Sequence, residues 1–394
     1  MPSCIRSFSD KRNIHSIAKA LNVTSTMNFR QFQTDPILPY ALSLFPCRSH
    51  SFGNLLVSLP LYPAGASARD RFVAERRGAR PSHDPWQYQG LIVEDERTGE
   101  GVRARTATVL LTGRECPWRC AMCDLWRYTT VADTPSGAIA AQVAAAVAAL
   151  HEEQPSVSVL KLYNAGSFFD PRAVPVEDYD AIAATLAGFS RLVVESHPAL
   201  IGPRVDRLLD ALSRHGVTPG RQAALEVAMG LETAHATALD RLNKRFTLTQ
   251  FEHAARALSR RGVALRVFLL ISPPFVASGE QDDWLLRSVD AAFGCGASVI
   301  ALVPTRPGNG AMEALAEAGL FRRPDLDEIE RSFALALGHA AGRGRVFVDC
   351  WELDRFAACV SCVTARRDRL HNMNLHQQML PPASCRHCTV AAHT

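Results

Sequence analysis

The sequence has very few lysines, no long apolar run and no strong excess of charge of either sign. Only four of its 394 residues are lysine, and the other positively charged side chains are arginine. No run approaches the roughly 18 to 20 apolar residues that span a bilayer, which argues against an integral membrane protein. The net charge of +4 is too small to indicate a nucleic-acid partner by itself. With 47% hydrophobic and 21% charged residues, the composition excludes a mainly disordered, collagen-like or heptad-repeat chain.

What the chain does contain is eleven cysteines, in a spacing that is not typical of a disulfide framework. Three lie within eight residues, and four more form two CxxC pairs. These are Cys116, Cys120 and Cys123, followed by Cys359 with Cys362 and Cys385 with Cys388. Clusters this tight suit metal ligation, in which several thiolates converge on one centre. Free thiolates imply a reducing compartment, so we expect a cytoplasmic protein.

The remaining cysteines carry less information. Cys4, Cys47 and Cys295 are expected to be ordinary small apolar residues. Cys350 ends an apolar run close to the paired cysteines, and the sequence leaves open whether it joins them.

The length fits two to three domains, or one αβ barrel with an appendage. Residues 1–60 are rich in Ser and Asn, unlike the Ala- and Arg-rich body. We predict a disordered tail or a start codon placed too far upstream, with a transit peptide as the alternative. Residues 61–105 are expected to be a lead-in segment with one strand, 106–348 a barrel, and 349–394 a cysteine-rich metal module.

Short apolar runs alternate with longer helical stretches through the central part. The runs are Ala107–Thr112, Ser158–Asn164, Arg191–His197, Ala224–Glu232, Ala264–Ser272 and Ser298–Pro304, with a seventh at Arg345–Cys350. Runs of five to nine residues without polar alternation suit buried parallel strands. Six such βα repeats predict an α/β fold, a (βα)6-type partial TIM barrel, whose chemistry gathers at the carboxyl ends of the strands.

The three clustered cysteines follow the first predicted strand by four residues, where a barrel enzyme would place a cofactor. Three thiolates in a CxxxCxxC spacing can hold three irons of a [4Fe-4S] cluster and leave the fourth iron open. An open iron can bind a small molecule through amino and carboxylate groups. A zinc site or incidental buried cysteines are the alternatives.

Other polar residues mark the ends of later strands. They are Asn164 with Gly166 and Ser167, then Glu195 with His197, then Glu232, and beyond it Lys244. Asn164, Glu195 and His197 should point toward the barrel mouth, where they could hydrogen-bond a substrate or transfer protons. A buried, satisfied histidine and a surface lysine are the commoner cases for His197 and Lys244.

Together these motifs resemble the radical S-adenosylmethionine (SAM) superfamily, and within it the archaeosine synthase radical-SAM subunit, a family of tRNA-modifying enzymes. The ordered stretches that carry the resemblance are Gly166–Asp170, Glu195–Pro198, Gly230–Glu232, Asn243–Arg245 and Ser272–Phe275. The resemblance covers about residues 107 to 306. The chain is also similar, more distantly, to the Elongator catalytic subunit and the methylthiotransferases. Three positions depart from the family pattern: Met122, Ala199 and Ser272 stand where an aromatic residue, a glutamate and a lysine are usual.

The resemblance implies a [4Fe-4S] cluster on Cys116, Cys120 and Cys123, which cleaves SAM to a 5′-deoxyadenosyl radical that abstracts hydrogen from a substrate. Gly166 and Ser167 would lie against the SAM amino group, Glu232 against its ribose, and Lys244 against its carboxylate. The implied substrate is a modified tRNA nucleoside, and a reductase or other electron donor is the implied partner. Whether the outcome is a lyase or a transferase reaction stays open.

The paired cysteines match a four-thiolate zinc pattern, with an auxiliary Fe–S cluster as the alternative. The arginine-rich stretch between them could contact phosphates or form a solvated helix face.

Two rival functions remain. One is a radical SAM enzyme that acts on a peptide or small metabolite. The other is a non-catalytic, zinc-binding, nucleic-acid-binding protein.

Overall fold

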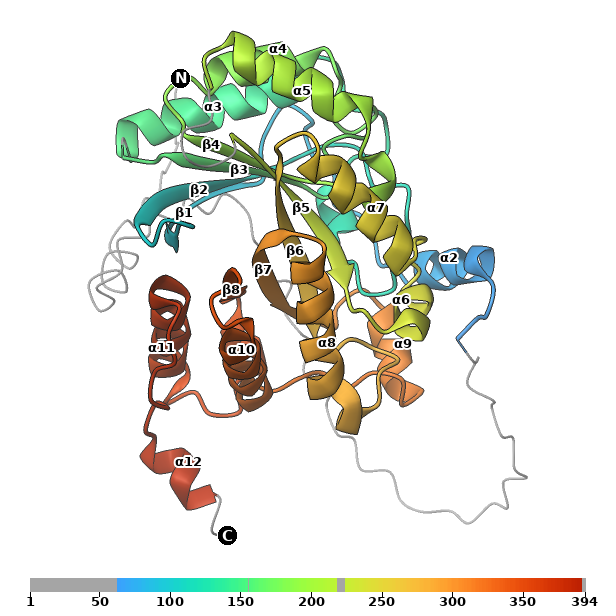
Figure 1. Ribbon diagram of the computed structural model, residues 1–394. Coiled ribbons are helices and arrows are strands. Elements are labelled where there is room, and N and C mark those ends of the chain that lie inside the picture. The colour runs from blue at the N-terminus through green and yellow to red at the C-terminus, as the bar shows by residue number, and fades with distance from the viewer. Residues whose placement is uncertain (1–61, 155, 218–223, 392–394) are drawn as a thin grey trace, which may run out of the picture.

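Each of the seven apolar runs forms a strand in the computed structural model, which describes residues 62–154, 156–217 and 224–391 (Figure 1). The predicted tail, with Cys4 and Cys47, lies outside the described residues. One further strand precedes the seven, and all eight join one sheet in chain order. The strands are β1 (Gly90–Arg97), β2 (Arg103–Leu111), β3 (Val159–Asn164), β4 (Arg191–Glu195), β5 (Leu225–Glu232), β6 (Ala264–Ile271), β7 (Ala297–Pro304) and β8 (Arg345–Val348).

The sheet is parallel from β2 to β8, and only β1 pairs antiparallel, with β2. Figure 1 shows the sheet curved, with its main helices on the outside. These are α3 (Ala138–Glu153), α4 (Asp178–Thr185), α5 (Pro203–Arg214), α7 (Leu248–Ser259), α8 (Gln281–Gly294) and α10 (Leu326–Ala340). The predicted (βα)6-type partial barrel is confirmed, with β1 and β8 added at its edges. No helix in the described ranges has the length and apolarity to cross a bilayer.

The barrel stays open between its edge strands, and helix α11 (Val363–His376) packs against both β1 and β8 (Figure 1). Its side-chain amides take the place of a neighbouring strand. Asn374 bonds the N–H and C=O of Val348, at 2.9 Å each, and Gln377, just after the helix, does the same at Val346 with distances of 2.8 and 2.9 Å. The edge of β8 is therefore hydrogen-bonded rather than exposed.

Charged side chains fill the amino-terminal half of the barrel interior, although the strands read as apolar runs. Arg266 binds Glu226 at 2.6 Å and Glu96 at 2.5 Å, and Lys161 also binds Glu96. Burial alone would raise the pKa of Glu96, but Arg266 and Lys161 hold it well below its usual value. The apolar residues of these strands instead face the surrounding helices in the main hydrophobic core.

A second, smaller hydrophobic core lies beside the cysteine loop. It joins helix α2 (Ala66–Glu75) from the lead-in segment with α9 (Ala311–Glu317). Ala121 of the loop is buried in it, and Met122 packs against it. A thioether adapts to irregular gaps, which explains how Met122 is accommodated where an aromatic residue is usual.

Candidate functional site

The three clustered cysteines lie in the loop that follows β2, at the carboxyl edge of the sheet. Cys120 is buried, and Cys116 and Cys123 are partly buried. Burial raises the pKa of each thiol to about 12, although backbone N–H groups of Trp118 and Leu125 face the sulfurs of Cys116 and Cys123. A bound metal ion would favour the thiolate form of these side chains, as it does for metal ligands.

Asn164, Gly166 and Ser167 lie where β3 ends, as expected. A Cβ at Gly166 would lie 3.2 Å from both the Arg114 carbonyl oxygen and Asn164 Nδ2, so the backbone here is closely approached. Ser167 Oγ accepts a bond from the backbone N–H of His197 at 2.8 Å, and its hydroxyl thus joins the ends of β3 and β4. Asn164 is 2% exposed, yet neither of its side-chain polar atoms has a hydrogen-bond partner. Such a buried amide is suited to a ligand.

His197 lies just beyond β4 with both ring nitrogens engaged. Nε2 lies 2.8 Å from the Lys244 carbonyl oxygen and must donate, while Nδ1 accepts from the backbone N–H of Ala199 at 3.2 Å. The ring stacks on Trp118 of the cysteine loop, with centroids 3.6 Å apart. Burial, with Lys244 nearby, lowers the pKa of His197 to about 3. This geometry favours a neutral His197 ring that stacks on Trp118. Proton transfer by His197 stays a prediction.

Glu195 is the last residue of β4, and its side chain is partly buried. Burial raises its pKa to about 8; Lys244 lowers it and Glu232 raises it further. It is therefore mainly protonated at neutral pH. A protonated carboxyl can donate a hydrogen bond, as a substrate-facing acid must.

Glu232 and Lys244 form an ion pair at the end of β5. Lys244 Nζ donates to Glu232 Oε1 at 2.8 Å, and the two side chains are 11% and 9% exposed. The register shifts between Gly230 and Glu232, and Glu232 has a φ of 68°. This bulge and left-handed residue place the carboxylate over Gly230.

The same pair lies within electrostatic reach of the cysteine loop. Burial alone would lower the pKa of Lys244, but Glu232 and Cys120 hold it above its usual value. The flanking residues Asn243 and Arg245 have φ values of 62° and 64°. Arg245 instead donates from Nη2 to Asp70 Oδ2 at 2.6 Å. The side chains of the neighbouring residues Lys244 and Arg245 therefore bind different carboxylates, Glu232 and Asp70.

The four C-terminal cysteines converge on one point. All their sulfurs lie within 4.8 Å of one another, the only group of this kind in the described chain. Cys359 and Cys385 sulfurs are 3.9 Å apart, and those of Cys362 and Cys388 are 3.6 Å apart. Cys350 is not part of this group: it is buried in the main core and receives a bond from Asn374.

Two arginines of the stretch between these pairs bind acidic side chains of α10. Arg366 binds Asp327 and Glu330 of α10, the latter at 2.9 Å, and Arg369 binds Glu330 at 3.4 Å. These two arginines attach α11 to α10.

No protein-family profile matches the sequence. Among curated proteins, archaeosine synthase subunit beta of Methanosarcina acetivorans is 30% identical over 258 residues, which is 62% of this chain and 69% of that protein. The chain belongs to this family. An uncharacterized protein of Methanocaldococcus jannaschii is 26% identical over 42% of this chain and 45% of its own length.

The solved structures that resemble this chain have lower sequence identity to it. Elp3 of Methanocaldococcus infernus is 11% identical, with 59% of each chain covered and a TM-score of 0.44. Methylornithine synthase is 13% identical, with 71% of this chain and 68% of that chain covered and a TM-score of 0.42.

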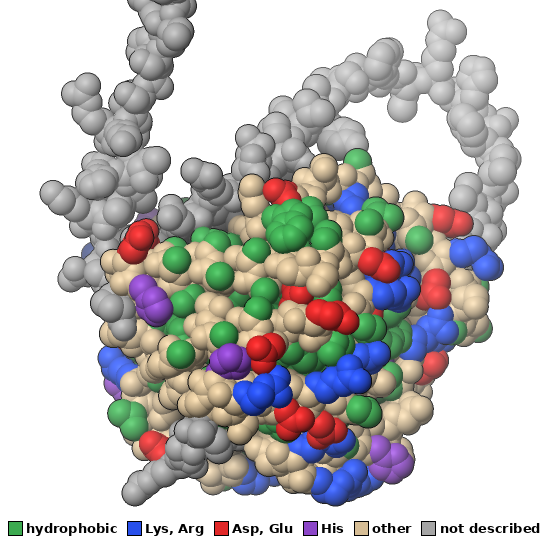
Figure 2. All heavy atoms as spheres, turned by 90° about the horizontal axis from the view of Figure 1, so that it is seen from above, with side chains coloured by type: hydrophobic (Ala, Val, Ile, Leu, Met, Phe, Trp, Pro, Cys, Tyr) green, Lys and Arg blue, Asp and Glu red, His purple; other side chains and the backbone are tan. Residues whose placement is uncertain are grey.

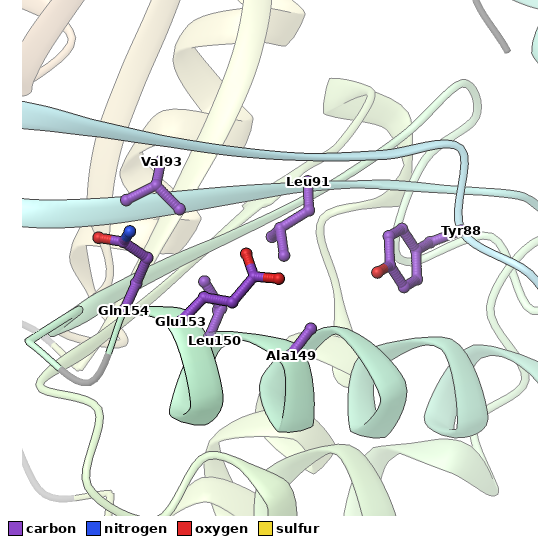
Figure 3. A pocket seen from close by; sticks show the side chains of 7 residues that line it. All are labelled: Tyr88, Leu91, Val93, Ala149, Leu150, Glu153 and Gln154. Carbon is purple, nitrogen blue, oxygen red and sulfur yellow. The ribbon is translucent and has the colours of Figure 1, made fainter. Parts of the chain in front are cut away.

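Ser272, one of the residues that depart from the family pattern, lies at a surface cavity. Ser272, the position of the usual lysine, lines a cavity of about 350 Å³ after β6. Arg241, Phe275 and Arg322 also line it. A second hollow, of about 10 Å³, lies between β1 and α3, where Leu91 and Val93 face Leu150 and Glu153 (Figure 3). The second has room for about one water molecule and lies outside the barrel mouth.

Sequence reasoning missed two residues of the site, Asn243 and Asn309. Both are buried, at 0% and 2% exposure, and both bond the backbone of the cysteine loop. Asn243 stands within a motif that carries the family resemblance. Asn309 follows Pro307-Gly308, and a Pro-Gly turn is by itself only a loop signal.

Proposed function

We propose that this protein is a radical SAM enzyme that acts on a modified tRNA nucleoside. The observation that supports this best is the meeting of four strand ends. The cysteine loop after β2, Asn164 of β3, Glu195 of β4 and the Glu232–Lys244 pair beyond β5 share one edge of a parallel barrel. The family assignment gives the proposal its substrate class, since a member is named for the synthesis of archaeosine.

The residues present fit a [4Fe-4S] cluster with SAM. Three thiols would hold three irons, and N–H groups of Trp118 and Leu125 already face two of the sulfurs. Asn164 is buried, and both polar atoms of its side chain lack a hydrogen-bond partner, so they are available to a polar ligand. When bound and reduced, the cluster supplies the electron that breaks the C5′–S bond of SAM, yielding methionine and a 5′-deoxyadenosyl radical.

The roles of the surrounding residues follow from their chemistry. Lys244 keeps two N–H donors beyond its bond to Glu232, and these suit the SAM carboxylate. The second oxygen of Glu232 suits a ribose hydroxyl. Gly166 allows close backbone approach beside Ser167, and Asn164 offers the two N–H donors and the carbonyl oxygen of its amide. Glu195, protonated at neutral pH, would donate to the substrate, and His197 would hold Trp118 over the loop.

Anaerobic reconstitution tests the reaction. Protein with about four irons per loop site, given dithionite and SAM, should release 5′-deoxyadenosine and methionine, measured by liquid chromatography. The matched control changes Cys116, Cys120 and Cys123 to Ala and should release neither. Full iron loading with no cleavage product would contradict the proposal.

Substrate class needs a separate experiment. Addition of tRNA carrying the archaeosine precursor should stimulate 5′-deoxyadenosine release, and binding should weaken with salt because phosphate contacts release counterions. On the face seen in Figure 2, acidic and basic side chains are interspersed rather than gathered by sign. The rival peptide or metabolite substrate is favoured by the loss of lysine at Ser272; stimulation by tRNA would exclude it.

We further propose that the C-terminal cysteines bind zinc. Four sulfurs at about 2.3 Å from one tetrahedral ion lie about 3.8 Å from each other. The separations of 3.9 and 3.6 Å agree with this, whereas cluster thiolates each bind a different iron. Metal analysis should find about one zinc per chain that survives loss of all four loop irons. About eight irons per chain without zinc would indicate a second cluster.

A further inference from the structure

Of the eight backbone carbonyl groups from Cys116 to Cys123, six accept hydrogen bonds from the protein. Arg119 donates to the carbonyls of Cys116 and Trp118, at 2.7 and 3.2 Å. The N–H of Cys123 donates to the Cys120 carbonyl at 3.2 Å. Asparagine side chains bind three more: Asn243 donates to Arg119 O at 2.8 Å, and Asn309 donates to Ala121 O at 2.7 Å and Cys123 O at 3.3 Å.

Asn309 contributes two of these bonds from a distant part of the chain. It lies in the loop between β7 and α9, 188 positions from Ala121. Its Oδ1 accepts the backbone N–H of Met312 at 2.8 Å. A carbonyl oxygen can only accept, so the amide orientation is determined on both sides: oxygen toward Met312, nitrogen toward the cysteine loop. Asn309 is only 2% exposed, so its amide is largely shielded from water.

This arrangement has an electrostatic consequence at the sulfurs. Carbonyl oxygens carry negative partial charge, and those of Ala121 and Cys123 point to Asn309, whose side-chain N–H groups bind them. N–H groups of Trp118 and Leu125 face the sulfurs instead. Backbone N–H groups directed at a thiolate stabilise its negative charge, as they do around Fe–S clusters. Reduction adds negative charge to a cluster, so a loop held in this conformation favours the reduced form.

We propose that Asn309 is a positioning residue for the cluster: by holding the Ala121 and Cys123 carbonyls, it secures the cluster in the loop and raises its reduction potential. This inference rests on the proposed function, because it assumes that the loop binds a [4Fe-4S] cluster. Asn309 touches neither the sulfurs nor any expected SAM contact, so its effect is exerted through the backbone.

Asn309→Asp is the sharpest variant. It keeps the shape and the acceptor for Met312, but it places a carboxylate oxygen against two carbonyl oxygens. Asn309→Ser removes the bonds without adding charge and serves if the Asp variant does not fold. Asn372→Asp on the exposed surface of α11 adds the same charge away from the loop and is the control.

Each protein is reconstituted anaerobically, and iron content, iron loss to a chelator and the midpoint potential by EPR-monitored titration are measured. Loss of a residue that supports metal ligands typically costs about 10- to 100-fold in affinity, so Asn309→Asp and Asn309→Ser should lose iron at least about tenfold faster than wild type. The cluster that remains in Asn309→Asp should have a more negative midpoint potential, a change that general destabilisation does not cause.

Wild-type iron retention and potential in both Asn309 variants would overturn the inference while leaving the proposed function intact. Equal shifts in Asn309→Asp and Asn372→Asp would also overturn it, because the effect would then be one of net charge. A wild-type protein that takes up no cluster would overturn the proposed function and this inference together.

Discussion

Oε1 of Glu232 occupies the space above Gly230: a Cβ at Gly230 would lie 2.2 Å from this oxygen and 2.9 Å from Lys244 Nζ. The Glu232–Lys244 ion pair therefore needs a glycine at position 230, because any side chain there would occupy the same space. Gly230→Ala should displace both charged groups and destabilise the protein by about 1–3 kcal/mol, as overpacking does. Denaturant unfolding and SAM-binding measurements check this. Gly279→Ala, where a Cβ meets nothing within 4 Å, is the control and should leave both unchanged.

Removing one partner of this pair should be costly because it leaves a buried charge without compensation. Lys244→Met is expected to reduce the free energy of unfolding by about 3–5 kcal/mol. Adding Glu232→Gln should recover part of this loss, since the unpaired charge is then gone. Arg256→Met is the control: it removes an exposed helical pair with Glu252, which contributes at most about 0.5 kcal/mol. An equal loss in both single variants would contradict the buried pairing.

The raised pKa of Glu195 predicts a pH dependence of stability. The folded state holds this proton up to about pH 8, while an ordinary carboxyl in the unfolded chain loses it near 4.5. The unfolded state therefore binds fewer protons between these values, and this carboxyl makes stability fall as pH rises through the interval. Denaturant unfolding of the metal-free protein should show a shallower decline in Glu195→Gln. Identical slopes in the two proteins would refute the assignment.

Zinc loss should loosen the edge of the barrel far from the metal. The cysteine pairs flank α11, whose Asn374, with the adjacent Gln377, binds the backbone of β8. A Cys359→Ser, Cys385→Ser double variant should lose zinc and exchange the Val346 and Val348 amide hydrogens faster, as measured by mass spectrometry. Cys295→Ser, outside the four-cysteine group, should retain zinc and wild-type exchange. Unchanged exchange in a zinc-free double variant would show that α11 holds β8 without the metal.

The second hydrophobic core gives a prediction about the lead-in segment. Gly310 has a φ of 78°, and a Cβ there would lie 2.0 Å from the Arg76 carbonyl oxygen, just beyond α2. Gly310→Ala should separate α2 from the cysteine loop and make the segment after residue 76 more sensitive to protease. Gly338→Ala within α10, where nothing lies within 4 Å, should not change the cleavage pattern. Equal protease resistance in the two variants would contradict this packing.

The local pattern of the sequence determined the strands, the order of the barrel repeats and the spacing of both cysteine groups. Buried parallel strands need apolar residues on the face toward the helices, and ligands close in sequence stay close in any fold. The interior charges were not predicted, because each of Glu226, Arg266 and Lys161 reads as an isolated polar residue within an apolar run. Their compensation depends on neighbours from other strands.

Only the tertiary structure decided how the candidate site is assembled. The bulge that turns Glu232 inward depends on the register with β6, and the pairing with Lys244 on the loop that follows. Asn309 reaches the cysteine loop across 188 positions, and no local pattern carries that contact. The sequence thus determined which chemical groups are present and their order, whereas contacts between distant segments decided which of them share a buried space, because burial and charge compensation arise only once the strands are packed together.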